Sequence, residues 1–392
     1  MGDNVIVSAA RTPVGSFLGT LAPLSAPQLG AIVIKAALER AGLKPEQVDE
    51  VIMGCVLSGG LGQAPARQAM VYAGLPWKVC ALTINKVCGS GLKSVMLADA
   101  MLTNGDAEII VAGGMESMSN APYFLPGARQ GYRMGDQKVI DLMIHDGLWD
   151  VYKNCHMGAC ADMLGREWKI SRKDQDDFCI RSYKRALKAI SEGRFKDEIV
   201  PVEIPSKKGA PVVVAEDEEP RKFKEEKIPE LKPAFTKDGT VTAANASSLN
   251  DGAGAVVVMS AKKAKSLGLK PLARIVGHCS AAKESDWFTI APIEAVKNLF
   301  KKTGYTQDQI DLFEINEAFS VQVIAAEREL KLDMEKVNVN GGSVAIGHPI
   351  GASGARILTT LLYALKNRNL KTGLATLCIG GGEAAAMIVE RV

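Results

Sequence analysis

Cys88 is the residue whose surroundings in this sequence most favour chemistry. The segment INKVCGSGLKSVMLADA, residues 84–100, changes from a strand-like run to a helical pattern directly after this cysteine. Gly89 and Gly91 permit tight backbone geometry at the start of the helix. A sulfur at that point faces unpaired N–H groups and the positive end of the helix dipole, which predicts a thiolate nucleophile. A small buried cysteine with no chemical role is the alternative.

Three further segments place polar side chains at strand ends or helix starts. His348 stands in the glycine-rich loop NVNGGSVAIGHPIGASGAR, and Cys378 ends an apolar run before three glycines. Asn316 and Glu317 follow another apolar run, where an ordinary helix cap is the alternative. Ligands of parallel sheets bind beyond the carboxyl ends of the strands, so these groups predict one site. A nucleophile, a base, a second acid/base and an amide donor are what acyl transfer requires.

The elements that carry these residues repeat along the chain. Residues 38–54 resemble residues 300–316 at an offset of 262, and residues 88–102 resemble residues 351–365 at an offset of 263. Each half therefore repeats one strand–helix alternation, which predicts right-handed crossovers and a mostly parallel sheet with helices on both faces. The repeat also predicts that the helix starts next to Cys88 and His348 approach each other.

The segment between the halves breaks the repeat and is interpreted as an insertion. Ser171, with Asp174 three residues later, predicts the start of a polar helix. The charged run at residues 216–227 is typical of a solvated surface loop. Such insertions commonly carry a binding site. The predicted domains are residues 1–118 with 250–270, the insertion at 119–249, and residues 271–392.

Composition excludes several classes of protein. The 392 residues include 47 basic and 44 acidic side chains without a long basic block, so a nucleic-acid partner is not expected. Eight cysteines without C-x-x-C spacing indicate reduced thiols in a reducing compartment. A strand-like run begins at Val5, and no apolar stretch reaches about 18 residues, so neither a secretion signal nor a membrane span is expected. We expect a cytoplasmic protein, with a mature organellar enzyme as the alternative.

The motifs NKVCGSG, VAGGMESMS, HMG, NEAF, VNVNGGSVAIGHPIGASGARI and CIGGG, in this order, closely resemble those of the thiolase family. The resemblance covers essentially the entire chain and is greatest to acetoacetyl-CoA thiolases. It implies an α/β fold of two duplicated βαβαβαββ core domains in a five-layered αβαβα arrangement, with an inserted loop domain. It also implies a homotetramer, a dimer of dimers, to which the region near residues 119–138 contributes.

The resemblance implies a role for each candidate residue. Cys88 attacks the thioester of acetyl-CoA and carries the acyl group, with His348 hydrogen-bonded near it. Cys378 removes a proton from a second acetyl-CoA, and the carbanion condenses to acetoacetyl-CoA and CoA, reversibly. His348 and a water placed by Asn316 hold the enolate oxygen, while the N–H groups of Cys88 and Gly380 receive the other oxyanion. No metal and no cofactor are implied beyond CoA as substrate or product.

Contacts along the CoA tail are implied for a second set of residues. Several of these, such as Leu148, have a core position as the alternative. Pro220 stands where potassium-activated relatives have a tyrosine, so the sequence departs from that pattern and a potassium site is not expected. The implied contacts are Leu148, His156, Met157, Arg221, Phe235, Ala243, Ser247, Ala318 and Phe319.

Four other functions are weighed against this one. A 3-ketoacyl-CoA thiolase of fatty acid β-oxidation shares the same chemistry and differs only in its acyl pocket. A ketoacyl synthase shares the fold, but Cys378 in CIGGG argues against it. Outside catalysis, a metal site built from Cys88, His348 and Cys378 or a catalytically silent acyl-CoA-binding protein remain as alternatives.

Overall fold

The computed structural model describes residues 4–206 and 209–392. Residues 1–3 of the predicted N-terminal domain and residues 207–208 of the predicted insertion lie outside that description. Across the described residues, ten strands form one mixed sheet. They are β1 (Asn4–Arg11), β2 (Gly15–Ser16), β3 (Glu50–Gly54), β4 (Cys80–Ile84), β5 (Ile109–Ser117), β12 (Asn250–Ser260), β13 (Ala273–Ala282), β14 (Leu312–Ile315), β15 (Thr372–Ile379) and β16 (Glu383–Glu390). Their order is β14-β15-β16-β13-β1-β12-β5-β3-β4, with β2 paired to β12.

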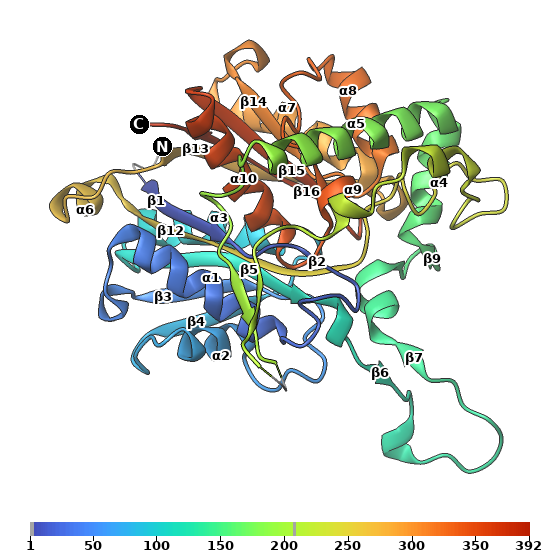
Figure 1. Cartoon of the computed structure of the whole chain (residues 1–392), viewed down its shortest axis with the longest axis horizontal. Coiled ribbons are helices and arrows are strands. Elements are labelled where there is room, and N and C mark those ends of the chain that lie inside the picture. Colours follow the sequence, from blue (N-terminus) through green and yellow to red (C-terminus); the bar gives the residue numbers. More distant parts are fainter. Residues whose placement is uncertain (1–3, 207–208) are drawn as a thin grey trace.

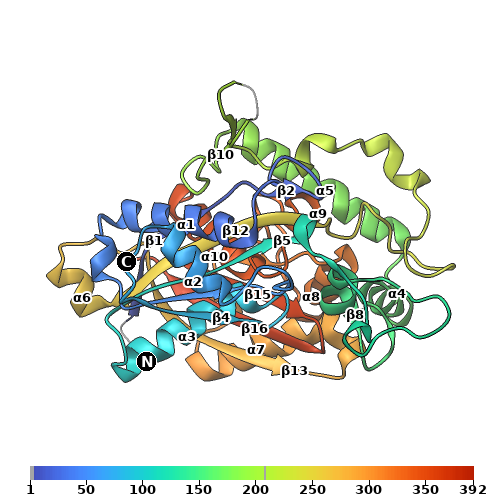
Figure 2. The ribbon, with the colours of Figure 1, turned by 90° about the horizontal axis from the view of Figure 1, so that it is seen from below.

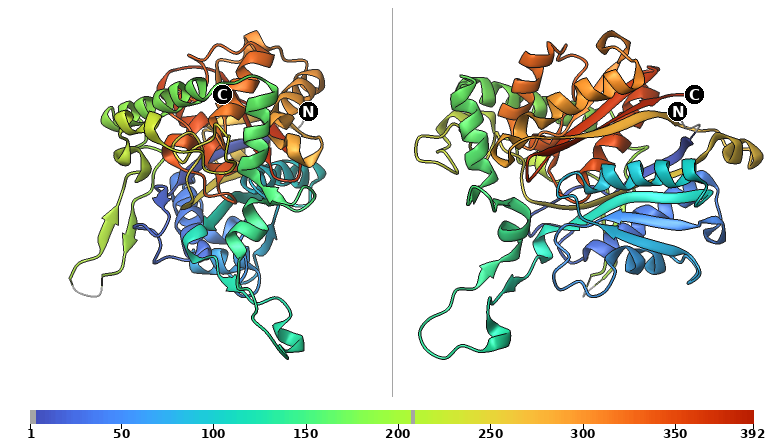
Figure 3. Two further views of the ribbon diagram at one scale, coloured as in Figure 1. Left: turned by 90° about the vertical axis from the view of Figure 1, so that its right-hand side faces the viewer. Right: turned by 180° about the vertical axis from the view of Figure 1, so that it is seen from behind.

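Helices and sheet alternate in five layers, as the resemblance implied. The helices of the two halves are α1 (Ala26–Ala41), α2 (Pro65–Tyr72), α3 (Ser90–Asn104), α6 (Ala261–Ser266), α7 (Ala291–Thr303), α8 (Ser320–Leu330), α9 (Ser343–Ile346) and α10 (Ser353–Asn367). α1 and α2 cover one half of the sheet, α7 covers the other, and α3 and α10 pack together between the halves (Figures 1 and 3). Every residue of α10 from Ser353 to Leu365 is buried, as expected for a central helix.

The sequence repeat is confirmed by the helix boundaries. α3 begins at Ser90 and ends at Asn104, while α10 begins at Ser353 and ends at Asn367. Both boundaries therefore differ by the offset of 263 seen in the sequence. The two central helices are equivalent parts of a duplicated unit.

The prediction of a mostly parallel sheet is wrong. Only β3 with β4, β3 with β5, and β14 with β15 run parallel among the described strands. β12 returns from the insertion without a crossover helix and pairs antiparallel with both β1 and β5. A glycine turn joins β15 directly to β16, which makes this pair an antiparallel hairpin. β1 also pairs with β13, so the two half-sheets are continuous.

The segment predicted as an insertion lies outside the repeated layers. Its helices are α4 (Met157–Glu167) and α5 (Arg172–Ser191), and its strands are β6 (Tyr123–Phe124), β7 (Ile140–Asp141), β8 (Trp149–Asp150), β9 (Cys155–His156), β10 (Val202–Ile204) and β11 (Val212–Val214). Ser171 caps α5 as predicted, since its hydroxyl accepts a hydrogen bond from the N–H of Asp174. β6 and β7 begin an arm that extends away from the body, and β10 also lies apart from the large sheet (Figures 1 and 2).

The charged run at residues 216–227 is not wholly solvated, contrary to prediction. Asp217 is only 1% exposed and accepts two hydrogen bonds from the guanidinium of Arg11, at 2.7 and 2.9 Å. Arg11 also donates to Glu198 at 2.6 Å. A buried charge is tolerated only when it is paired, so this cluster fixes the insertion to β1. Among the described residues, no helix combines the length and apolar character needed to cross a membrane.

Candidate active site

A cavity of about 380 Å³ opens where both halves meet the insertion. Cys88, His348 and Gly380 lie in its wall, and most of the remaining wall is apolar. A π-helical stretch at Met143–Leu148 supplies part of that wall from the insertion. Eight of the nine implied CoA contacts line this cavity, namely Leu148, His156, Met157, Phe235, Ala243, Ser247, Ala318 and Phe319.

Two glycines bring the starts of the central helices together, as the repeat predicted. A Cβ atom on Gly91 would lie 2.7 Å from the backbone nitrogen of Ala355 in α10. A Cβ atom on Gly354 would overlap the backbone of Leu92 in α3. Only glycine permits such a close approach from both sides. The loops that carry Cys88 and His348 therefore converge on one cavity.

Cys88 lies two residues before α3, in a tight turn. The backbone of Val87 is left-handed, with φ of 44°, and the Ser90 hydroxyl accepts from the N–H of Lys86 and donates to the carbonyl of Val87. Burial raises the pKa of the Cys88 thiol to about 11, although the backbone N–H groups of Gly380 and of Cys88 itself oppose that shift. The predicted resting thiolate is therefore wrong, because desolvation outweighs the donors at the helix start.

His348 is held as a neutral base. The hydroxyl of Ser353 lies 2.6 Å from Nδ1 and donates to the carbonyl of Pro349 at 2.9 Å. The Pro349 carbonyl can only accept, so when the Ser353 proton points to it, Nδ1 carries the ring hydrogen and donates it to Ser353. Burial, aided by the charge of Arg356, lowers the pKa of His348 to about 3. Among the described residues Nε2 has no hydrogen-bond partner, so the implied bond to Cys88 is absent.

Asn316 is oriented by residues that sequence analysis did not identify. It follows β14 directly, and its Oδ1 accepts a hydrogen bond of 2.6 Å from the hydroxyl of Ser343. That hydroxyl in turn accepts from Arg356 of α10. Nδ2 of Asn316 is buried without a partner among the described residues. A buried donor without a partner costs free energy unless a water or ligand group satisfies it.

Glu317 has a structural position rather than the ordinary helix cap considered above. Its carboxylate accepts hydrogen bonds from Ser182 of α5 at 2.7 Å and from Asn338 at 2.7 Å. The N–H of Val344 in α9 donates to the same carboxylate at 3.1 Å. Glu317 therefore ties the insertion to the loop that precedes His348.

Cys378 lies at the end of β15, as predicted. Its sulfur is fully buried, 3.6 Å from Oε1 of Gln322 in α8, and is not part of the cavity wall. Burial raises the pKa of this thiol well above its ordinary value, and the charge of Cys88 adds to that effect. Gly380, two residues after Cys378, lies in the same cavity wall as Cys88, so the end of β15 borders the cavity.

Glu116, at the end of β5, joins the two halves behind Cys88. Its carboxylate accepts hydrogen bonds from the N–H groups of Val56 and Leu57, both at 3.1 Å, and of Gly351 at 2.9 Å. Burial raises its pKa to about 7. The sequence signal was a single charged residue near the end of a largely apolar strand, in VAGGMESMS.

Arg221 is the implied contact that the structure does not bring to the cavity. Its guanidinium pairs with Glu216 on an exposed stretch.

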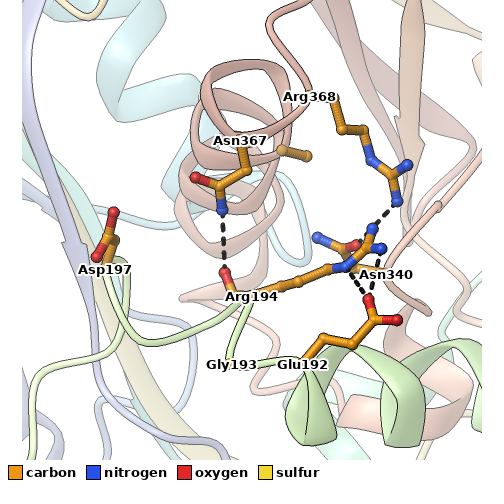
Figure 4. A pocket seen from close by; sticks show the side chains of 8 residues that line it. Glu192, Gly193, Arg194, Asp197, Asn340, Asn367 and Arg368 are labelled. Atoms are coloured by element: carbon orange, nitrogen blue, oxygen red, sulfur yellow. Dashed lines mark hydrogen bonds and ion pairs between the residues drawn. The ribbon is translucent and has the colours of Figure 1, made fainter.

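A second cavity, of about 460 Å³, lies elsewhere, and its wall contains no cysteine or histidine (Figure 4). Arg194 pairs there with Glu192, and Arg368 reaches Asn340 at 3.4 Å. Within residues 4–206 and 209–392, no group of three His, Cys, Asp or Glu side chains is arranged to hold a metal ion.

Comparisons with known proteins identify the family of this chain. The model of the thiolase N-terminal domain matches residues 4–262, and that of the C-terminal domain matches residues 269–391. An acetyl-CoA acetyltransferase of Cupriavidus necator is 58% identical, with 100% of both chains covered. A Gibberella zeae acetyl-CoA acetyltransferase named cytosolic is 50% identical, with 99% of this chain and 98% of its own covered. The crystal structure of the Bacillus anthracis acetyl-CoA acetyltransferase superposes with a TM-score of 0.98 at 43% identity, covering 100% of this chain and 99% of that one. The chain belongs to the thiolase family.

Proposed function

We propose that this protein is an acetyl-CoA C-acetyltransferase, which reversibly condenses two acetyl-CoA molecules to acetoacetyl-CoA and CoA. The observation that carries the proposal is one cavity that combines Cys88, His348 and the N–H of Gly380 with an apolar wall suited to a pantetheine tail. Relatives that match over their full length have this activity in their names. A cytoplasmic location is part of the proposal, since one of them is named cytosolic.

The first half-reaction transfers an acetyl group to Cys88. The pKa of Cys88 lies far above that of His348, so Nε2 takes the thiol proton as the sulfur attacks, not before. The N–H groups of Cys88 and Gly380 receive the negative charge of the tetrahedral intermediate, and each such donor contributes about 3 kcal/mol. CoA leaves as a thiolate and takes the proton of Cys378, while His348 keeps its added proton.

The second half-reaction uses the charges that the first one leaves. The Cys378 thiolate removes an α-proton from a second acetyl-CoA, for which its raised pKa makes it a strong base. Protonated Nε2 of His348, with a water held by Asn316, stabilises the enolate oxygen. The enolate attacks acetyl-Cys88, acetoacetyl-CoA departs, and the released Cys88 thiolate recovers its proton from His348. Atoms and protons therefore balance over the cycle.

Substitution of the two sulfurs separates the half-reactions. Cys88→Ala abolishes the incorporation of labelled acetyl into the protein, because no nucleophile remains. Cys378→Ala still accepts the label but loses condensation, because no base remains for the α-proton. Mass spectrometry of the labelled protein measures the first step, and acetoacetyl-CoA formation measures the second. A Cys88→Ala protein that still becomes acetylated would assign the nucleophile to another residue.

Ser353→Ala tests how His348 is oriented. Loss of the acceptor for the Nδ1 hydrogen lets the ring turn or change tautomer, so kcat falls by about ten- to 10²-fold, the cost of misplacing a reacting group by about 1 Å. KM stays unchanged, and Ser353→Thr, which keeps the hydroxyl, restores kcat. Ser94→Ala is the control, since the hydrogen-bond partners of this buried α3 hydroxyl among the described residues are the carbonyls of Gly91 and Gly113. Equal kcat values for Ser353→Ala and Ser94→Ala would contradict the role.

The acyl range distinguishes this activity from that of a β-oxidation thiolase. Thiolysis of acetoacetyl-CoA and of a long-chain 3-ketoacyl-CoA is compared at equal CoA concentration. We expect kcat/KM to favour acetoacetyl-CoA by more than about 10²-fold. The pantetheine tail fills much of the cavity of about 380 Å³, which leaves little room for a long acyl chain. Comparable values for the two substrates would instead favour the β-oxidation enzyme.

A homotetramer built as a dimer of dimers is also proposed. The arm that carries β6 and β7 exposes large apolar side chains, among them Tyr123 (65% exposed), Met134 (93%) and Val139 (58%). β4 leaves the edge of the large sheet open, which offers a second surface. Exposed apolar patches of this kind mark contacts between proteins. Sedimentation should report four chains of 41.7 kDa, and Met134→Asp should give dimers. A wild-type monomer would contradict the assembly.

A further inference from the structure

We propose that Cys155 and Cys160 form a reversible dithiol–disulfide site next to the wall of the acyl-CoA cavity, and that its oxidation weakens acyl-CoA binding. Their sulfurs lie 3.7 Å apart. Neither cysteine takes part in the mechanism above. The inference rests on the proposed function only for the identity of the ligand whose binding changes.

The backbone brings the two thiols together. Cys155 lies in β9, which pairs with β8, and Cys160 lies in the first turns of α4, directly after that strand. A disulfide has a sulfur–sulfur distance of about 2.05 Å, so bond formation must close a gap of about 1.7 Å. In the proposed site, rotation of the two side chains and a shift of β9 or of the first turn of α4 close this gap together.

That shift moves the wall of the cavity. The ring closed by a Cys155–Cys160 bond contains His156 and Met157, which both line the cavity. His156 stacks on Phe235 of the same wall, with the ring centroids 4.6 Å apart. Gly158 packs so closely on Phe235 that a Cβ atom would overlap the aromatic ring. The first turn of α4 therefore cannot move without displacing side chains that line the cavity.

The surroundings of the two thiols set the order of the steps. Cys155 is half-buried, whereas Cys160 is only 2% exposed. Burial raises the pKa of the Cys160 thiol, and the charges of Asp150 and Asp286 act in the same direction. Cys155 is therefore the thiol that meets an oxidant first, and Cys160 is the resolving thiol.

The oxidant in this proposal is a low-molecular-weight disulfide. The Cys155 thiolate attacks one of its sulfurs, which breaks the oxidant's S–S bond and releases one thiolate. The Cys160 thiolate then attacks Sγ of Cys155, which forms the protein disulfide and releases the second thiolate. Two electrons pass from the cysteine pair to the oxidant, and the two thiol protons go to the released thiolates. A small dithiol reverses both steps.

The test equilibrates the wild-type protein with mixtures of oxidised and reduced glutathione and then alkylates the remaining thiols. Trypsin releases residues 154–166 as one peptide, since it cleaves after Lys153 and after Arg166. After oxidation we expect this peptide to carry no alkyl group and to be lighter by two hydrogens than the same peptide with two free thiols. KM for acetoacetyl-CoA should rise roughly tenfold, within the cost of up to 10²-fold for a misplacement of about 1 Å. Dithiothreitol should restore both readings.

Two variants assign the effect to this pair. Cys155→Ser should lose the KM response, whereas Cys279→Ser, which changes another partly buried cysteine, should keep it. A peptide alkylated on both cysteines at every glutathione ratio would overturn the proposal. A disulfide that forms but leaves KM unchanged would also overturn it, as would a rise in KM on oxidation that persists in Cys155→Ser. The peptide mass does not depend on activity, so failure of the proposed function is recognised separately, by absent thiolysis in the reduced protein.

Discussion

The close approach of α3 and α10 is the constraint on which the rest of the structure depends. Gly91 and Gly354 occupy equivalent places in the two halves, and each removes the side chain that would hold the helices apart. The same contact brings the turn of Cys88 and the loop of His348 to one cavity. A fold with two copies of one unit thus obtains a site that neither copy contains alone, because the groups come from opposite sides of a shared interface.

Burial at this interface sets the resting charge of the site. It raises the pKa of Cys88 to about 11 and lowers that of His348 to about 3, so both groups are neutral at rest. The pKa of Glu116 is raised to about 7 by the same cause. In the proposed reaction, charge therefore develops only when a thioester is present to accept it, at a point where backbone N–H groups of Cys88 and Gly380 already converge. Desolvation also limits side reactions of the free thiol.

Local sequence patterns predicted the parts of this protein that depend on short segments. The repeat located α3 and α10, the cap at Ser171 marked α5, and the resemblance to thiolases implied eleven residues of the cavity wall, namely Cys88, His348, Gly380 and the eight CoA contacts. Features that depend on distant contacts were not predicted. β12 runs antiparallel to β1 because of the path by which the chain re-enters the sheet after the insertion. The Asp217 carboxylate can be buried because it is paired with the guanidinium of Arg11, far away in the sequence. The Cys88 thiol is neutral because residues from several distant segments bury it. The local sequence at the start of α3 does not show that burial.

The residues of α10 that orient the groups of the site explain how one fold can keep its chemistry while its substrate changes. On α10, Ser353 hydrogen-bonds the ring of His348, and Gly354 permits the close contact with α3. Arg356 donates to the Ser343 hydroxyl, which in turn holds Asn316. Because α10 is enclosed on all sides, none of these groups can move without repacking both halves. The wall of the cavity instead comes largely from the insertion, including the stretch at Met143–Leu148 and the start of α4. Differences in substrate therefore require changes in the insertion, and the central helices can remain as they are.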